Sequence, residues 1–267
     1  MNNRRLALVT GASAGIGEAF ARLYAARGHD LVLTARRADR LERLADALGR
    51  DHGARVLVLP ADLSQPGAVV GLVSALEAEG RAVDVLVNNA GYGLPGRYGE
   101  TPWADQADFL QVMVTAPSEL AHRLAPGMAA RGHGRILNVA SLAGLAPGGP
   151  GATLYAASKA FLVRFSESLH LELRGSGVHV TALCPGFTYS EFHDVTGSRA
   201  LVSRSTPGWI WQDAASVARA GYAAAEANQP VCVPGAVNKL LAMLARLTPE
   251  SLAMAVLAQH GKQVRVL

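Results

Sequence analysis

Short apolar runs alternate with longer amphipathic segments along the chain. The apolar runs show no regular polar alternation, which is typical of strands covered on both faces. They predict strands over residues 4–10, 31–35, 55–59, 83–88, 135–139, 178–183 and 231–233. Between them, apolar residues recur at spacings of three and four, which indicates helices. The predicted helices span residues 16–27, 39–48, 69–79, 103–131, 154–174 and 214–227.

The order of these elements indicates the fold class. Strands separated by helices require right-handed crossover connections and therefore a parallel sheet. We predict an α/β fold with one doubly wound parallel sheet of about seven strands, a Rossmann fold. No change of composition divides the chain, so we expect a single domain over residues 1–267. The amphipathic tail over residues 236–267 is expected to cover the core, pair with another subunit or touch a membrane surface.

Composition excludes several classes of protein. Of the 267 residues, 50% are hydrophobic and 17% are charged, which excludes a disordered chain. The two cysteines, Cys184 and Cys232, exclude a disulfide scaffold and fit no metal-binding spacing, so we expect no metal site. They indicate buried thiols and a reducing, cytoplasmic location. The formal charge of +4 is spread in Lys and Arg runs no longer than two, so we expect no nucleic-acid partner.

Two segments bear on membrane insertion. The first residues contain no long apolar stretch, so we expect no signal peptide. The longest uncharged stretch, residues 136–158, has the length of a membrane span but includes six glycines and prolines in its middle. We therefore interpret that middle part as a loop and expect no membrane partner.

A glycine-rich loop over residues 10–17, Thr-Gly-Ala-Ser-Ala-Gly-Ile-Gly, joins the first predicted strand to the first helix. Gly11 permits a tight turn, Gly15 lets the backbone approach a pyrophosphate, and Gly17 lets the helix pack closely on the sheet. The helix start offers unpaired N–H groups and a positive dipole end to an anion. We expect a dinucleotide here, bound by Gly11, Ser13, Gly15, Ile16 and Gly17.

The end of the second strand indicates which dinucleotide. Sites for NAD place a carboxylate there for the adenosine ribose, but this strand ends in Ala35 followed by Arg36. The planar guanidinium of Arg36 suits a 2′-phosphate, so NADP(H) is preferred, with NAD(H) as the alternative. The alternative interpretation is that Arg36 and Arg37 are solvated charges of a loop and bind no phosphate. Asp62 either accepts a hydrogen bond from the adenine amino group or caps the end of its strand.

A tyrosine, a lysine and a serine form a second group. Tyr155 and Lys159 are four residues apart and share one face of a helix. An ammonium group beside a phenol stabilises the phenolate, and the positive nicotinamide of an oxidised cofactor adds to this effect. Tyr155 is therefore a candidate general acid and base for a carbonyl or an alcohol. Ser141 ends the fifth strand, where it can hydrogen-bond the same substrate oxygen.

These motifs resemble those of the short-chain dehydrogenase/reductase family, in the same order and spacing. The matching residues are 10–17, Asn88-Asn89-Ala90-Gly91, Ser141, Tyr155, Lys159, Pro185-Gly186 and Thr188. The resemblance implies an NAD(P)-dependent oxidoreductase that transfers a hydride reversibly between the cofactor and an alcohol or carbonyl. It implies that Tyr155 is the acid and base, that Lys159 binds the nicotinamide ribose, and that Ser141 positions the substrate oxygen.

The same resemblance assigns further residues. Asn89, Pro185, Gly186 and Thr188 are expected at the cofactor. Residues 187–212 are expected to be a mobile substrate lid, whose aromatic residues indicate either a hydrophobic ketone or secondary alcohol as substrate, or an anchor for the lid. His193 in that lid is expected to be structural. The family also implies a homodimer or homotetramer formed through the long fourth and fifth helices.

One position departs from the family pattern. Many members carry an asparagine thirteen residues before a proline, where it distorts the helix and holds a water that links the lysine to solvent. Counting back from Pro126 gives Met113, whose thioether cannot replace an amide. The alternatives for this relay are a water held by backbone carbonyls, a hydroxyl of Thr115 or Ser118, or slow turnover of the enzyme. A non-catalytic NADP(H)-binding module is the competing function, whereas the glycine spacing argues against an epimerase or dehydratase.

Overall fold

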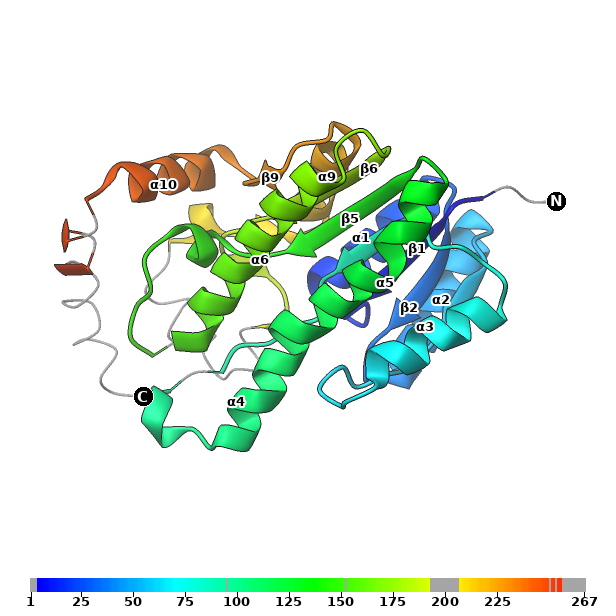
Figure 1. Cartoon of the computed structure of the whole chain (residues 1–267), viewed down its shortest axis with the longest axis horizontal. Helices are drawn as coiled ribbons and strands as arrows, with labels where there is room; N and C mark the ends of the chain where they lie inside the picture. Colours follow the sequence, from blue (N-terminus) through cyan, green and yellow to red (C-terminus); the bar gives the residue numbers. More distant parts are fainter. Residues whose placement is uncertain are drawn as a thin grey trace.

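A computed structural model describes residues 4–94, 96–151, 153–192, 207–249, 251–252 and 254–255. In this part of the chain, a parallel sheet has seven strands in the order β3-β2-β1-β4-β5-β6-β9 (Figure 1). The strands are β1 (Leu6–Thr10), β2 (Asp30–Thr34), β3 (Val56–Val58), β4 (Val85–Asn88), β5 (Gly134–Val139), β6 (Val178–Leu183) and β9 (Val231–Cys232). The predicted doubly wound α/β fold is confirmed.

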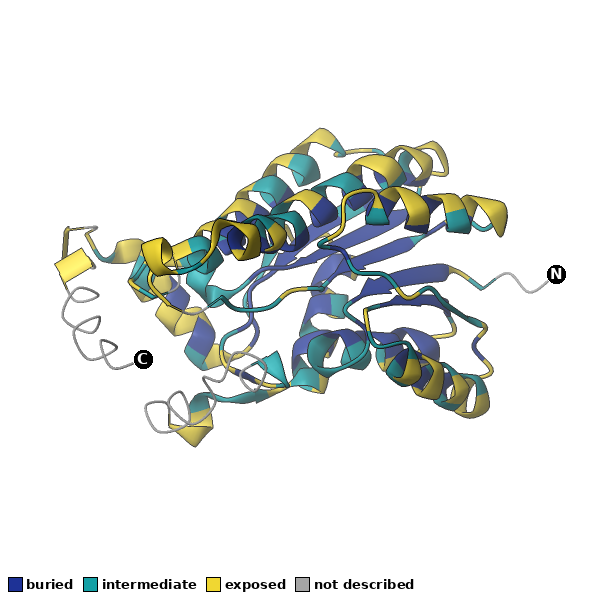
Figure 2. Cartoon of the chain, turned by 90° about the horizontal axis from the view of Figure 1, so that it is seen from below, coloured by how far each residue is buried: buried dark blue, intermediate teal, exposed yellow. Residues whose placement is uncertain are grey.

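Helices cover both faces of the sheet, as Figure 2 shows from below. Side chains alternate along β1, so Leu6 and Leu8 enter the core on one face while Ala7 and Val9 enter the core on the other. The helices are α1 (Gly15–Ala26), α2 (Ala38–His52), α3 (Ala68–Ala78), α4 (Trp103–Leu110), α5 (Ala116–Ala130), α6 (Thr153–Glu172), α9 (Ala214–Glu226) and α10 (Ala236–Leu247). Short 3-10 turns are η1 (Tyr98–Glu100), η3 (Leu142–Leu145) and η4 (Gly208–Ile210).

The predicted continuous helix over residues 103–131 is interrupted. A π-helical turn, η2 (Gln111–Thr115), separates α4 from α5. Pro117 follows this turn, and because its nitrogen carries no hydrogen, it cannot donate to the carbonyl of Met113. The helix is therefore distorted at Met113 without an asparagine at that position, and Pro117 supplies a local reason.

The strand order places a crevice at the carboxyl ends of β1 and β4, because the chain leaves β3 and crosses to the opposite side of β1. Buried amides hold the end of β4 to the neighbouring strand β5. Asn88 Nδ2 donates to Asn138 Oδ1 at 2.8 Å, and Asn138 Nδ2 donates to Ser166 Oγ on α6 at 2.9 Å. The edge that carries the predicted motifs is thus tied to the helix that carries Tyr155.

Part of the predicted lid over 187–212 is described. β7 (Thr188–Tyr189) pairs in parallel with β8 (Gln212–Asp213), so the two ends of this segment lie side by side. Residues 193–206, including His193, lie outside the described residues.

The predicted C-terminal tail begins with α10. Asn238 and Ala242 are buried, whereas the four leucines and the methionine of this helix are exposed, up to 72% at Leu247. Beyond Pro249, the described residues 251–252 and 254–255 are helical. In the described part of the chain, none of the helices combines the length and the apolarity that crossing a membrane requires.

Candidate active site

A cleft of about 1040 Å³ runs along the carboxyl edge of the sheet. It starts at the glycine-rich loop between β1 and α1 and ends at Tyr155 on α6. The predicted site residues that line it are Gly11, Ser13, Gly15, Ile16, Arg36, Asp62, Asn89, Ser141, Tyr155, Lys159, Pro185, Gly186 and Thr188. Gly17 is buried behind the loop. The tertiary fold thus gathers into one cleft residues that the sequence spreads over nearly 180 positions.

The glycine-rich loop is held tightly between β1 and β4. A Cβ on Gly17 would lie 2.3 Å from the Gly11 carbonyl oxygen, so only glycine fits at this position. Asn89 Nδ2 donates to the Thr10 and Gly11 carbonyls at 2.9 and 3.2 Å. The helix α1 begins after Ala14, whose methyl side chain cannot accept a hydrogen bond from the first turn. The N–H groups of that turn are therefore available to an anion, which fits a dinucleotide pyrophosphate.

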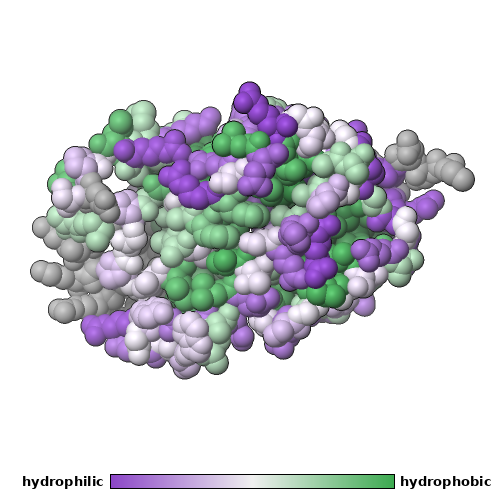
Figure 3. All heavy atoms as spheres, viewed as in Figure 1, coloured by the Kyte–Doolittle hydropathy of each residue, from purple (hydrophilic) through white to green (hydrophobic). Residues whose placement is uncertain are grey.

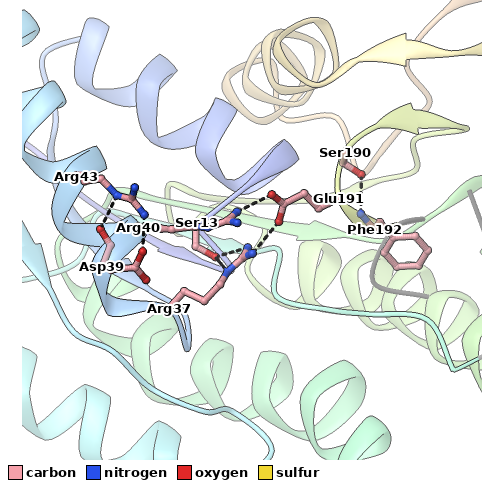
Figure 4. A network of polar contacts seen from close by, with 8 residues as sticks. All are labelled: Ser13, Arg37, Asp39, Arg40, Arg43, Ser190, Glu191 and Phe192. Carbon is pink, nitrogen blue, oxygen red and sulfur yellow. Dashed lines mark hydrogen bonds and ion pairs between the residues drawn. The ribbon is translucent and has the colours of Figure 1, made fainter. Parts of the chain in front are cut away.

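The arginines after β2 differ in their surroundings. Arg36 is exposed and lines the cleft. Arg37 is no solvated loop charge, because its guanidinium donates to Ser13 Oγ at 3.0 Å and to Glu191 Oε2 at 2.7 Å (Figure 4). Arg40, one turn into α2, donates to Glu191 Oε1 at 2.5 Å. The sequence analysis missed Arg40 and Glu191, because no motif connects residues about 150 positions apart.

Asp62 follows the third strand and lines the cleft. Its Oδ1 accepts hydrogen bonds from the Ser64 amide at 3.0 Å and from the Ser64 hydroxyl at 2.9 Å. This geometry is the local strand-end cap that was one of the two interpretations of Asp62.

Ser141, Tyr155 and Lys159 lie together at the other end of the cleft. Ser141 lies two residues after the end of β5 and caps η3, where its Oγ accepts a hydrogen bond from the Ala143 amide at 3.2 Å. A Cβ on Gly144 would lie 2.5 Å from the Lys159 carbonyl carbon, so η3 packs directly against α6. The Lys159 ammonium donates to the Val139 carbonyl at 2.7 Å and lies 5.7 Å from the centroid of the Tyr155 ring.

Burial has the largest effect on the pKa values of Tyr155 and Lys159. It raises the pKa of the Tyr155 phenol above its ordinary value of 10.0, and a hydrogen bond with Ser141 opposes part of that rise. Burial also lowers the pKa of Lys159 from 10.5 to about 8. Lys159 therefore loses its proton more easily than an exposed lysine. The protein alone keeps Tyr155 protonated, which suits a proton donor to a carbonyl.

Met113 lies beneath this end of the cleft and is 1% exposed. Its sulfur occupies the space beside Gly91, where a Cβ on the glycine would lie 2.8 Å from Sδ. A small cavity of about 10 Å³ lies between Met113, Asn88 and Val139, close to the lower size limit for one water. Asn88 Oδ1 is buried without a hydrogen-bond partner among the described residues, so a water there would have a polar neighbour.

The two alternative hydroxyls do not approach this cavity. The Ser118 hydroxyl donates to the Val114 carbonyl of its own helix at 2.7 Å, and Thr115 is exposed. Neither hydroxyl is therefore placed to take over the proton relay, and a water held by backbone carbonyls stays a prediction.

The loop after β6 forms the wall facing Ser141. The Pro185 carbonyl accepts a hydrogen bond from the Leu142 amide at 2.9 Å, and Thr188 Oγ1 donates to the Gly186 carbonyl at 3.1 Å. Asn238 on α10 packs against Gly186, where a Cβ would lie 2.4 Å from Asn238 Oδ1. The sequence analysis missed Asn238, whose position depends on how α10 folds back over the cleft.

An aromatic ring lies beside the ring of Tyr155. The Phe192 ring lies 5.6 Å from it, and the Trp211 ring stacks on Tyr189 at 4.9 Å. Leu142, Ile210 and Leu241 add further apolar surface to the cleft. Trp209, by contrast, is 70% exposed.

Comparisons with known proteins agree with this geometry. A family model described as short chain dehydrogenase matches residues 5–199. Nodulation protein G of Rhizobium sp. (strain N33) is 43% identical over 190 residues, which cover 71% of this chain and 76% of that protein. A short-chain dehydrogenase from Sphingobium yanoikuyae in complex with NADPH is 30% identical, with a TM-score of 0.80 over 98% of this chain and 96% of that one. The bulky-bulky ketone specific alcohol dehydrogenase from Comamonas testosteroni is 28% identical, with a TM-score of 0.76 over 99% and 96% of the two chains.

Proposed function

Since this chain belongs to the short-chain dehydrogenase/reductase family and is an NAD(P)-dependent oxidoreductase, we propose that it interconverts a bulky hydrophobic ketone and its secondary alcohol with NADP(H). The observation that carries the proposal is the meeting of Ser141, Tyr155 and Lys159 in one cleft with the glycine-rich loop. Neither group alone defines a reaction, but together they place a proton donor beside a dinucleotide site.

The reaction needs one proton and one hydride. When bound, the nicotinamide cofactor supplies the hydride to the carbonyl carbon. Tyr155 donates its phenolic proton to the carbonyl oxygen, and Ser141 donates a hydrogen bond to the same oxygen. Lys159 keeps a positive charge near the phenol and stabilises the phenolate that forms. In the reverse direction, Tyr155 takes the proton back from the alcohol.

The dinucleotide is held by residues on both sides of the crevice. The loop residues Gly11, Ser13, Gly15 and Ile16 take the pyrophosphate, and Gly17 sets their distance from the sheet. Pro185, Gly186, Thr188 and Asn89 lie along the remainder of the cleft. Exposed Arg36 favours NADP(H), because its guanidinium is available to a 2′-phosphate while Ala35 supplies no carboxylate for the ribose. NAD(H) is the alternative cofactor.

The walls near Tyr155 support an apolar substrate. Phe192, Leu142 and Ile210 line the cleft there, and apolar surface dominates small-molecule sites of this kind. The similarity to a dehydrogenase specific for bulky ketones supports the same class. The test is a panel of ketones from acetone to diaryl and steroid ketones, with NADPH oxidation read at 340 nm. We expect kcat/KM to rise with apolar size; preference for small polar carbonyls would contradict the substrate class.

The competing function, a cofactor-binding module without turnover, depends on Met113. The test measures NADPH binding and oxidation in the wild-type protein and in Met113→Asn. Oxidation by the wild type rejects the module. Tight binding without oxidation in either protein, across the whole panel, would support it and reject the oxidoreductase mechanism.

We further propose a cytoplasmic homodimer or homotetramer. Cys184 and Cys232 are free thiols, which supports a reducing compartment; Cys184 is buried as predicted, whereas Cys232 at the sheet edge is only partly buried. On the face that α4, α5 and α6 form, Figure 3 shows hydrophobic residues across the middle of the surface. Phe161 and Leu171 on α6 are 39% and 64% exposed. Light scattering tests this assembly, and a monomeric mass at micromolar concentration would contradict it.

A further inference from the structure

The described segment that follows β7, residues 190–192, lines the cleft and contacts arginines beside the glycine-rich loop. Glu191 pairs with Arg37 through Oε2 at 2.7 Å and with Arg40 through Oε1 at 2.5 Å (Figure 4). Arg37 also donates to Ser13 of the glycine-rich loop at 3.0 Å. The carboxylate of Glu191 thus holds two arginines that follow β2, and one of these, Arg37, connects it to the loop after β1.

These donors form a site for a dianionic group. Two guanidinium groups and a serine hydroxyl converge beside the end of β2, where an adenosine ribose lies in a doubly wound fold. A phosphate offers three acceptor oxygens and binds bidentately to arginine, and a carboxylate is its closest side-chain equivalent. Arg40 and Arg37 hold the pKa of Glu191 below its ordinary value, so the carboxylate stays ionised in this position.

The same segment covers two other parts of the cleft. A Cβ on Gly15 would lie 2.9 Å from Ser190 Cβ, so residue 190 rests on the loop that a pyrophosphate approaches. The neighbouring Phe192 lies 5.6 Å from the Tyr155 ring. Three consecutive residues therefore occupy the arginine site, the pyrophosphate loop and the space beside the phenol.

We propose that Glu191 is a specificity-determining residue: its carboxylate fills the arginine site, and a cofactor with a 2′-phosphate displaces it and so releases Phe192 from Tyr155. The inference builds on the proposed NADP(H) preference and adds a competitor within the chain. A cofactor without the 2′-phosphate leaves the pairs with Arg37 and Arg40 intact. The preference for NADPH over NADH then depends on release of this segment as well as on the contacts between the arginines and the 2′-phosphate.

The first test measures dissociation constants for NADPH and NADH in the wild-type protein and in Glu191→Gln. The variant keeps the size of the side chain but removes its charge. We expect it to bind NADPH about five- to tenfold more tightly, since two half-exposed ion pairs no longer have to be broken. The dissociation constant for NADH should change by less than about twofold.

Asp39→Asn is the matched control. Asp39 pairs with Arg43 on the same stretch of α2, so the substitution changes the local charge equally without touching the Glu191 pairs. It should leave the ratio of the two dissociation constants within about twofold of the wild type. Weaker NADPH binding in Glu191→Gln would show that Glu191 closes over the bound cofactor, and would overturn the proposal. Equal tightening for both cofactors, or no change in either, would also overturn it.

The second test follows the segment itself by hydrogen exchange. Adenosine 2′,5′-bisphosphate and 5′-AMP differ by the 2′-phosphate, and each is added at a saturating concentration. We expect the bisphosphate to speed amide exchange in residues 188–192 at least about twofold, with no such effect from 5′-AMP. Slower exchange with the bisphosphate would overturn the inference. Because both tests read binding, their failure leaves the role of Tyr155 in turnover open to its own test.

Discussion

The two ends of the cleft are built in different ways. At one end, Lys159 is 5% exposed and Tyr155 lies one turn earlier on the same helix, so burial fixes the amine and backbone geometry fixes the phenol relative to it. At the other end, Arg37 and Glu191 have side chains that are about 40% exposed and are held by their ion pair and by the hydrogen bond from Arg37 to Ser13. Substitution of a buried charged group costs several kcal/mol of stability, whereas an exposed ion pair contributes about 1 kcal/mol or less and can exchange partners easily. The end around Tyr155 and Lys159, the proposed catalytic end, suits proton transfer, which needs fixed atoms. The end around Arg37 and Glu191, the proposed recognition end, suits binding of an anion that must enter and leave.

Removal of the phenol should have the largest effect. Tyr155→Phe keeps the ring and its contact with Phe192 but removes the proton donor. We expect kcat to fall about 10³-fold while the dissociation constant for NADPH changes by less than about threefold. The control Tyr98→Phe removes an exposed phenol outside the cleft and should retain full turnover. Retained turnover in Tyr155→Phe would refute its acid and base role.

Reversal of charge at the recognition end should have the next largest effect. Arg36→Asp replaces a guanidinium by a carboxylate beside Ala35. We expect the preference for NADPH over NADH, measured as the ratio of kcat/KM values, to fall about 100-fold. Arg50→Asp makes the same charge change in the last turn of α2 and should leave the ratio nearly unchanged. An unchanged ratio in Arg36→Asp would remove Arg36 from the phosphate site.

The buried amine should give a smaller effect, visible in stability. The pKa of Lys159 is about 8 in the folded protein and 10.5 when unperturbed, so between these pH values the unfolded chain holds a proton that the folded protein lacks. The free energy of unfolding therefore rises with pH in that window. Below pH 8, Lys159 is charged in both states, and the full cost of burying its charge lowers the stability. We expect the wild type to gain about 2 kcal/mol relative to Lys159→Met between pH 8 and 10.5. Urea unfolding at several pH values measures this difference, and parallel curves would contradict it.

The smallest effect is expected beneath the catalytic end. Met113→Leu keeps the apolar volume beside Gly91, so turnover should stay within about twofold and stability within about 1.5 kcal/mol. Steady-state kinetics and thermal unfolding measure both quantities. A loss of turnover above about tenfold with unchanged stability would assign the thioether a part in the proton relay and would blur the contrast between the two ends.

Local patterns predicted where Ser141, Tyr155 and Lys159 lie, because these residues are close in sequence or follow a strand end. Tyr155 and Lys159 are one helical turn apart, and Ser141 follows a legible buried strand. Their meeting in one cleft follows from the parallel sheet, whose carboxyl ends share an edge. The π-helical turn at Met113 was missed although Pro117 stands in the sequence, because apolar periodicity over residues 103–131 continues through it.

The recognition end was predicted only in part, because its contacts join distant segments. Arg36 and Arg37 are adjacent, yet one is exposed and the other is paired with Ser13 and Glu191. Asn238 reaches Gly186 through the placement of α10. Neither contact can be predicted from the spacing of residues in the sequence, because contacts between distant residues depend on how the loops cross the edge of the sheet.

Residue order alone thus determined the α/β class, the glycine-rich turn and the tyrosine–lysine pair, because backbone geometry makes each of them a short-range consequence of spacing. Packing in three dimensions decided the rest: which arginines pair with Glu191, how Phe192 comes to lie beside Tyr155, and how far burial moves the pKa of Lys159. Those properties depend on distances through space and on exclusion of water, and both arise only once the sheet, the helices and the loop after β6 have come together.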